Sequence, residues 1–87
     1  MWKVEFTDIA VRKIEQLDPQ VKKRIIGFFR ERVVHASDPA SIAEPLRGEF
    51  RGLWRFRIGD YRAICDIQRK QVLVLVLEVG HRKEIYR

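Results

Sequence analysis

The sequence predicts an α+β fold in which two N-terminal helices pack on a mainly antiparallel, twisted sheet, in the order β-α-α-β-β-β-β. Two observations lead to this class. Apolar residues recur at helical spacing only within residues 9–36, and the second half consists of strand-like runs with short connections. A length of 87 residues, 46% of them hydrophobic, suits one small core. We therefore expect a single domain spanning residues 1–87.

The first half supplies one strand and both helices. Residues 2–6 alternate between apolar and polar side chains, as in a strand with one buried face. Thr7 suits the N-cap of the first helix, and Asp18-Pro19 ends that helix and begins a second one, whose apolar stripe reaches Ala36. Gly27 interrupts the second helix, and we expect it to mark close packing against the first.

The second half predicts four strands. They cover residues 46–50, 53–58, 61–68 and 71–79, separated by Arg51-Gly52, Gly59-Asp60 and Arg69-Lys70. Such short connections are typical of antiparallel hairpins. The run from Val72 to Leu77 is apolar throughout, so we expect a central strand covered on both faces, with the two helices on one side.

Several classes of protein are excluded by composition. The longest apolar run is far too short to cross a bilayer, and Lys3, Glu5 and Asp8 interrupt any signal-peptide core. Cys65 is the single cysteine and has no neighbouring cysteine or paired histidine at zinc-site spacing. We expect a cytoplasmic protein that neither associates with a membrane nor binds a metal ion or cofactor. We expect Cys65 to be a small core residue.

Positive charge is concentrated in the second half. The net charge is +6, and residues 47–87 carry ten basic and five acidic side chains, whereas residues 1–46 carry eight and seven. A localised basic surface attracts phosphates, although many small basic proteins carry such charge only as a solvated face.

Three arginines are predicted to meet on one face of the hairpin around Gly59-Asp60. With a two-residue turn, Arg57 lies opposite Arg62 and Arg55 opposite Ile64. Side chains alternate along a strand, so the arginines share a face with Leu53 and Ile64. The other face carries core residues: Trp54, Phe56, Ile58, Tyr61, Ala63 and Cys65.

Adjacent arginines on a sheet indicate an anionic ligand. Like charges directly opposite each other destabilise a sheet, and a bound anion removes that penalty. Edge strands also carry charges that deter aggregation, but lysine serves that purpose equally well. Arginine's planar fork matches phosphate oxygens and keeps its charge at neutral pH, which favours an RNA-phosphate site.

Three segments together resemble the RelE/ParE superfamily of toxins from type II toxin-antitoxin systems. They are Glu44-Pro45-Leu46, the stretch Gly52-x-Trp54-Arg55-x-Arg57-Ile58-Gly59-Asp60-Tyr61-Arg62, and Val79-Gly80-His81-Arg82-Lys83-Glu84-Ile85-Tyr86. The resemblance covers nearly the whole chain and implies the RelE/ParE-like fold, which has the same order of elements. It is nearest the RelE branch, and Glu44-Pro45-Leu46 resembles the YoeB branch.

The resemblance implies an endoribonuclease that enters the A site of a 70S-type ribosome and cuts mRNA. In that reaction the 2′-hydroxyl attacks its own phosphate and leaves a cyclic phosphate. Cations around the reacting phosphate and an aromatic platform for a base are the chief requirements. By motif the candidate catalytic residues are Arg55, Arg57, Arg62, Arg82 and Tyr86, and the further candidate RNA contacts are Arg47, Arg51, Lys83 and Arg87.

Two residues are candidates for the general base. Arg55 and Arg57 stand where the RelE pattern has lysines, and an arginine has almost no neutral form at pH 7. The proton acceptor is therefore His81 or Glu44. His81 adjoins Arg82, whereas Glu44 matches the glutamate of the YoeB branch but can equally be a loop residue.

Two other functions fit the same motifs. One is a ParE-like inhibitor of DNA gyrase without nuclease activity, and the other is a non-catalytic RNA-binding module. The number of arginines disfavours the first, and the lack of an aromatic pair on the basic face disfavours the second. A toxin of this kind requires a cognate antitoxin protein. We expect the antitoxin to cover the basic sheet or the helices with acidic and apolar residues.

Overall fold

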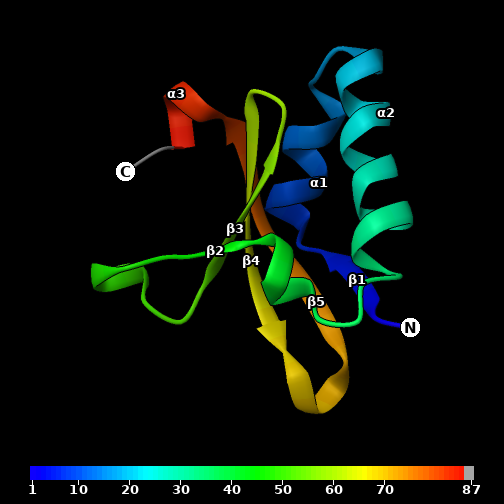
Figure 1. The fold of residues 1–87 in the computed structure, drawn as a ribbon. Helices are drawn as coiled ribbons and strands as arrows, with labels where there is room; N and C mark the ends of the chain where they lie inside the picture. Colours follow the sequence, from blue (N-terminus) through cyan, green and yellow to red (C-terminus); the bar gives the residue numbers. More distant parts are fainter. Residues whose placement is uncertain (86–87) are drawn as a thin grey trace.

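A twisted sheet of five strands carries both N-terminal helices on one face (Figure 1). The computed structural model describes residues 1–85. Its strands are β1 Lys3–Phe6, β2 Glu44–Pro45, β3 Trp54–Ile58, β4 Tyr61–Gln68 and β5 Leu73–His81, and its helices are α1 Asp8–Glu15, α2 Pro19–Phe28 and α3 Arg82–Ile85. The spatial order is β1-β5-β4-β3-β2, with β1 parallel to β5 and every other pair antiparallel. The predicted α+β class is confirmed.

The helix boundaries follow from capping residues. Thr7 Oγ1 accepts the backbone N–H of Ala10 at 3.1 Å and donates to the carbonyl of Leu77 at 2.9 Å, so one side chain caps α1 and ties it to β5. Asp18 accepts from the N–H of Gln20 at the start of α2, where Pro19 needs no hydrogen-bond partner. After Phe28 the helix widens into a π-helical turn over Phe29–Val33.

The core lies between the helices and the sheet and is centred on aromatic rings. Phe29 of the helical segment contacts Phe6, Phe28 and Phe56 edge to face, with ring centroids 5.4–5.6 Å apart. Phe56 is fully buried and Phe29 is 2% exposed. Burying such a side chain contributes roughly 1.5–3 kcal/mol, so this cluster fixes β3 against the helices.

The predicted hairpin register is confirmed residue by residue. Ile58 pairs with Tyr61, Arg57 with Arg62, Phe56 with Ala63, Arg55 with Ile64, and Trp54 with Cys65. Gly59 begins the turn with φ of +61°, a conformation that favours glycine. Because alternate residues face opposite sides, burial of Phe56, Ile58, Ala63 and Cys65 leaves the arginines on the other face.

The strand predicted over residues 46–50 is wrong. The strand that pairs with β3 is Glu44–Pro45, and Gly48–Phe50 form a 3-10 turn. Gly48 adopts φ of +67°, which bends the chain away from an extended path. Pro45 is tolerated because β2 is the outermost strand, where a missing N–H costs no ladder bond.

Two smaller expectations also fail. β5 has two neighbouring strands as predicted, but only its helix-side face is fully covered, and Leu75 and Leu77 on β5 stay partly exposed. Space around Gly27 is open, since a Cβ there would meet no atom within 4 Å, so Gly27 does not mark close packing.

The C-terminal segment forms α3, which folds toward the face opposite α1 and α2 (Figure 1). Among residues 1–85, no helix is long and apolar enough to span a membrane.

Candidate functional site

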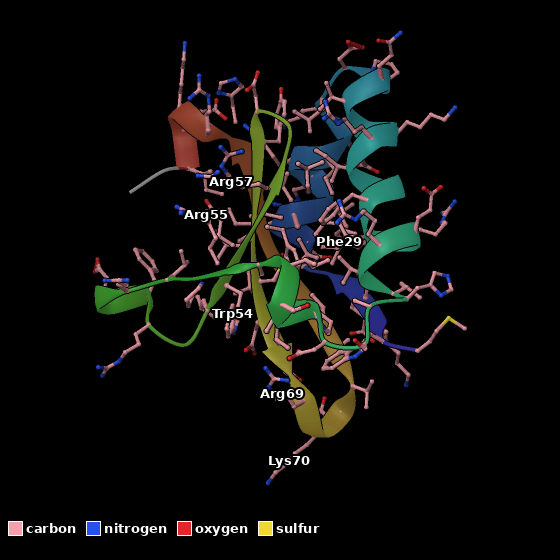
Figure 2. The ribbon with its side chains drawn as sticks, in the orientation of Figure 1. Phe29, Trp54, Arg55, Arg57, Arg69 and Lys70 are labelled. Atoms are coloured by element: carbon pink, nitrogen blue, oxygen red, sulfur yellow. The ribbon has the colours of Figure 1, made fainter. Side chains whose placement is uncertain are left out.

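Arg55, Arg57 and Arg62 lie on the sheet face opposite the two long helices. Figure 2 shows Arg55 and Arg57 on the far side of the sheet from Phe29. Arg57 is directly opposite Arg62 across the β3–β4 ladder, at a spacing where side chains interact. We call these three residues, together with Arg82, the arginine cluster.

Glu44 of β2 is bound between two members of the arginine cluster. Its Oε1 lies 3.1 Å from Nη2 of Arg55 and 3.3 Å from Nε of Arg57. The side chain of Arg55 is 17% exposed, whereas that of Arg57 is 62% exposed. Arg55 is thus held in place by the protein, and Arg57 remains accessible to a ligand. Glu44 belongs to a strand and not to a loop, because it pairs with Arg55 in the β2–β3 ladder.

Arg62 is the centre of the cluster electrostatically. Partial burial, followed by the charges of Arg57, Arg55 and Arg82, lowers its pKa from the usual arginine value, and Glu44 acts in the opposite direction. Nη1 of Arg62 donates to the carbonyls of Gly59 and Tyr61, each at 2.9 Å. Three guanidinium groups therefore act on that of Arg62, and the carboxylate of Glu44 opposes them.

Arg82 reaches the cluster because the C-terminal segment is attached to the hairpin tip. Its backbone N–H donates to the carbonyl of Asp60 at 2.8 Å, and its Nε lies 3.7 Å from Oδ1 of the same residue. Arg24 from α2 packs at the same turn, since its guanidinium would be 2.7 Å from a Cβ on Gly59. The C-terminal segment therefore lies beside the hairpin tip.

The structure does not bring His81 together with the arginine cluster. His81 pairs with Tyr61 in the β4–β5 ladder, and the two rings contact each other edge to face at 5.4 Å. Paired residues share a face, and Tyr61 packs against the helix-side core. Nδ1 of His81 also accepts the N–H of Lys83 at 3.1 Å, so the neutral ring carries its proton on Nε2.

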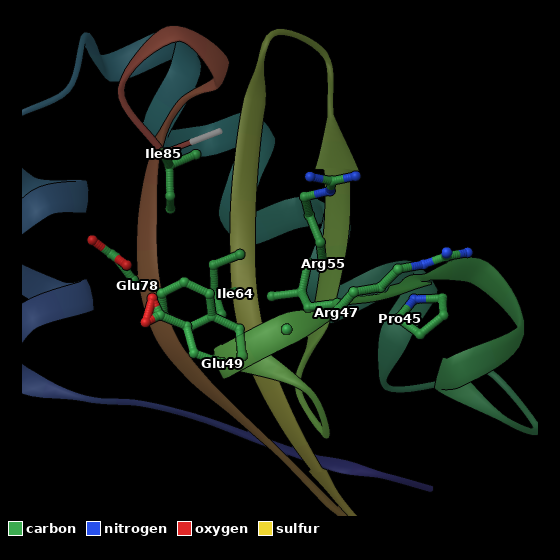
Figure 3. Close-up of a pocket in the computed structure, with 10 residues that line it drawn as sticks. Pro45, Arg47, Glu49, Arg55, Ile64, Glu78 and Ile85 are labelled. Carbon is green, nitrogen blue, oxygen red and sulfur yellow. The ribbon is translucent and has the colours of Figure 1, made fainter. Parts of the chain in front are cut away.

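Among the described residues, the other predicted RNA contacts are Arg47, Arg51 and Lys83, and all three are exposed. Arg47 and Arg51 flank the turn at Gly48–Phe50, and Lys83 is exposed on α3. Arg47 and Arg55 also line a cavity that the sequence did not predict, because it forms only where this turn meets β4 and α3 (Figure 3). Gly48 and Gly52, on either side of Phe50, are the sequence feature that could have predicted a folded turn. Tyr86 and Arg87 lie outside the described residues.

The arginine side chains on this face can donate hydrogen bonds and carry positive charge. Within residues 1–85, no group of three histidine, cysteine, aspartate or glutamate side chains is placed to hold a metal ion. The face offers guanidinium donors, with the carboxylate of Glu44 among them, and an adjoining cavity with its own charged lining. The fold and this face together define an α+β protein whose sheet carries a basic face opposite its two helices.

Comparison with known proteins gives the family. Residues 4–86 match the family model described as the ParE toxin of type II toxin-antitoxin systems. The chain is 32% identical over 84 residues to Toxin RelG of Mycobacterium tuberculosis, covering 97% of this chain and 94% of that one. It is 26% identical to Toxin RelE of the same organism, covering 97% and 84%. The protein belongs to the RelE/ParE superfamily of type II toxin-antitoxin toxins, as its motifs suggested.

Solved structures agree with the fold. The RelBE2 toxin-antitoxin complex of M. tuberculosis matches with a TM-score of 0.85 and 30% identity, covering 93% of this chain and 91% of that one. The intact RelBE complex of Escherichia coli matches with a TM-score of 0.73 and 19% identity, covering 93% and 96%. The second likeness concerns the fold alone.

Proposed function

We propose that this toxin acts in the cytoplasm as a ribosome-dependent endoribonuclease that cuts mRNA in the A site and thereby stops translation. The observation that carries the proposal is the arginine cluster, in which Arg57 lies directly opposite Arg62 and one carboxylate, Glu44, contacts both Arg55 and Arg57. Such a cluster suits a phosphate whose charge grows during the reaction. Relatives named Toxin RelG and Toxin RelE support the RelE branch.

In the proposed reaction the 2′-oxygen attacks the adjacent phosphorus as the bond to the 5′-oxygen breaks. The 2′-hydroxyl gives its proton to a base, the 5′-oxygen takes one from water, and the products are a 2′,3′-cyclic phosphate and a free 5′-hydroxyl. Arg57 and Arg62 would bind the non-bridging oxygens, because Arg57 is exposed and Arg62 is opposite it. Arg55 would add charge from a fixed position. Tyr86 remains a proposed stacking residue by motif alone.

We assign the base to Glu44 in preference to His81. Glu44 contacts Arg55 and Arg57 directly, so its carboxylate lies among the groups that would hold the phosphate. The ring of His81 is on the other face, and its Nδ1 accepts from Lys83. A proton acceptor must be within hydrogen-bond reach of its substrate, and Glu44 meets that condition better.

The proposed partner is a cognate antitoxin. Structures similar to this one are toxin-antitoxin complexes from M. tuberculosis and E. coli. The open face of this chain has a basic region and partly exposed Leu75 and Leu77, which suits a segment with acidic and apolar residues. Such a segment would neutralise the cluster and exclude RNA.

The test is cleavage of mRNA on purified ribosomes, mapped by primer extension. Arg57→Ala and Arg62→Ala are each expected to reduce the cleavage rate by about 10²–10³-fold, the usual loss when one donor to a charged transition state is removed. Arg12→Ala, which removes an exposed arginine from α1, is the matched control and should cut at the wild-type rate. Wild-type protein that leaves every mRNA intact refutes the proposal.

Gyrase inhibition is the second candidate, favoured by the ParE description of the matched family model. A supercoiling assay with purified gyrase separates the two, because the nuclease leaves supercoiling unchanged. A non-catalytic RNA-binding protein is distinguished in the cleavage assay itself. In that case arginine substitutions weaken RNA binding and reduce its salt dependence, but no cut product forms with any variant.

A further inference from the structure

A cavity of about 470 Å³ opens on the same sheet face as the arginine cluster (Figure 3). Its apolar lining is Pro45, Leu46, Phe50, Ile64 and Ile85, and its charged lining is Arg47, Glu49, Arg55 and Glu78. The volume is in the range of small-molecule pockets, and such pockets combine an apolar lining with a few polar groups.

The cavity is continuous with the arginine cluster. Arg55 lines the cavity and is also bound to Glu44 in the cluster. Ile64 lines it as well, and Ile64 is two residues from Arg62 on the same face of β4. Two residues of a strand span about 7 Å, roughly the length of one nucleotide. A phosphate at Arg62 would therefore have a base of the same or the next nucleotide at the cavity.

The lining suits a nucleobase in particular. Phe50 is 42% exposed, so its ring is open to a stacking partner, and Ile64 and Ile85 offer apolar contact. Glu49 and Glu78 can only accept hydrogen bonds when ionised. In the described part of the chain, neither of these two carboxylates takes part in an ion pair or a side-chain hydrogen bond.

We propose that this cavity is a subsite for one unstacked base of the RNA, beside the phosphate held by the arginine cluster, and that it prefers guanine. Guanine has an imino and an amino donor side by side, which match a carboxylate. Uracil has one N–H between two carbonyl oxygens that a carboxylate repels. The proposal rests on the proposed function, since it assumes that the arginine cluster holds RNA.

An apolar side chain of a protein partner fits the cavity less well. It would fill the apolar lining but would cover Glu49 and Glu78 without offering either a donor, and burying an unpaired charge is costly. A base satisfies both requirements, because its face is apolar and its edge carries N–H groups.

Amide chemical shifts measured by NMR test the subsite with three probes: guanosine 3′-monophosphate, uridine 3′-monophosphate and inorganic phosphate. We expect the guanosine probe to shift the amides of Ile64, Ile85 and residues 48–50, and phosphate to shift only those near Arg57 and Arg62. The guanosine probe should bind about 5- to 150-fold more tightly than the uridine probe, the discrimination usual for one good hydrogen-bonded base contact.

Two variants and one control isolate the contacts. Glu78→Gln should bring the two nucleotide affinities to within a few fold of each other, and Phe50→Ala should weaken both. Both residues are exposed, so neither change disturbs the core. Glu5→Gln removes the same charge from β1 outside the cavity and should retain the wild-type ratio.

Equal shifts with all three probes, no shifts around the cavity, or a wild-type ratio in Glu78→Gln overturns the subsite. The proposed function is judged separately by cleavage on ribosomes. Cleavage without cavity shifts refutes the subsite alone, and cavity shifts without cleavage refute the nuclease alone.

Discussion

Repulsion among arginines is built into the open face of this toxin, and one glutamate partly relieves it. Arg57 stands opposite Arg62, and both Arg55 and Arg82 add to the lowering of the pKa of Arg62. Glu44 contacts Arg55 and Arg57 through one oxygen, so it already occupies part of the space where a phosphate would bind. In the proposed reaction Glu44 is both counter-ion and base.

Replacing Glu44 by Gln separates these two roles. As a counter-ion, Glu44 competes with phosphate, so Glu44→Gln should bind inorganic phosphate several-fold more tightly in a calorimetric titration. As the base, it should be needed for the chemical step, and cleavage should fall by about 10²–10⁴-fold with loss of the acidic limb of the pH-rate profile.

His81→Asn is the companion variant for this experiment. If Glu44 is the base, His81→Asn keeps the shape of the pH-rate profile. Tighter phosphate binding with undiminished cleavage in Glu44→Gln would show that Glu44 is a counter-ion only and would return the base to His81.

At the scale of elements, α3 is attached to the rest of the fold by polar contacts. Glu84 Oε1 accepts from Nζ of Lys13 on α1 at 3.1 Å and from the N–H of His81 at 3.3 Å. Together with the bond from Arg82 to Asp60, these contacts fix α3 beside the hairpin tip. Arg82 therefore depends on this attachment for its place in the cluster.

This attachment should weaken in acid. The hydrogen bond from Lys13, then that from the backbone of His81, lowers the pKa of Glu84 below its usual value of 4.5. A depressed folded-state pKa means that the contact stabilises the fold above pH 4.5 and is lost as pH falls through the lower folded value. Glu84→Gln should therefore be less stable than wild type at pH 7, and the difference should vanish in strong acid.

Urea denaturation across pH 2–7 measures this difference. Glu15→Gln, an exposed carboxylate on α1, is the matched control and should follow the wild-type curve. A constant gap between Glu84→Gln and wild type at all pH values would contradict the assignment.

Two glycines should respond in opposite directions to alanine. Gly27 has open space around it within a helix, so Gly27→Ala should stabilise the protein by about 1 kcal/mol. Gly59 has φ of +61°, and a Cβ there would lie too close to the guanidinium of Arg24, so Gly59→Ala should destabilise the protein by about 1–2 kcal/mol. Thermal unfolding measures both, and a lower Tm for Gly27→Ala would show a contact that the structure lacks.

The whole molecule is organised around one core that includes both helices and the inner strands. Cys65 is fully buried in this core, and burial, then the nearby charge of Asp66, raises the pKa of its thiol far above the usual range. A thiolate is the reactive species, so the native protein protects this residue in two ways.

Thiol labelling of Cys65 should therefore report global unfolding. We expect no reaction with a disulfide reagent in native buffer over minutes, and full reaction of one thiol per chain in denaturant. The labelling rate at intermediate urea should follow the unfolding measured by circular dichroism. Fast labelling of the native protein would indicate local opening of β4.

The β3–β4 hairpin shows how far sequence patterns reach. Its register was predictable because side chains alternate with a period of two and Gly59-Asp60 permits only a tight turn, so Arg57 and Arg62 had to be neighbours. The family motifs predicted the class of protein for a similar reason, because each motif lies in one contiguous stretch of sequence. The strand at residues 46–50 failed because pairing of so short an edge strand depends on its partner, β3, more than on its own residues.

The sequence by itself determined the α+β class, the two helices, the hairpin and the face on which three arginines meet. Only the tertiary structure decided that Glu44 lies between Arg55 and Arg57, that His81 faces the other side, and that a cavity adjoins Arg55. The physical reason is the range of the interactions. Periodicity and turn chemistry act between neighbours in the chain, whereas these contacts join segments brought together only by burial of the common core.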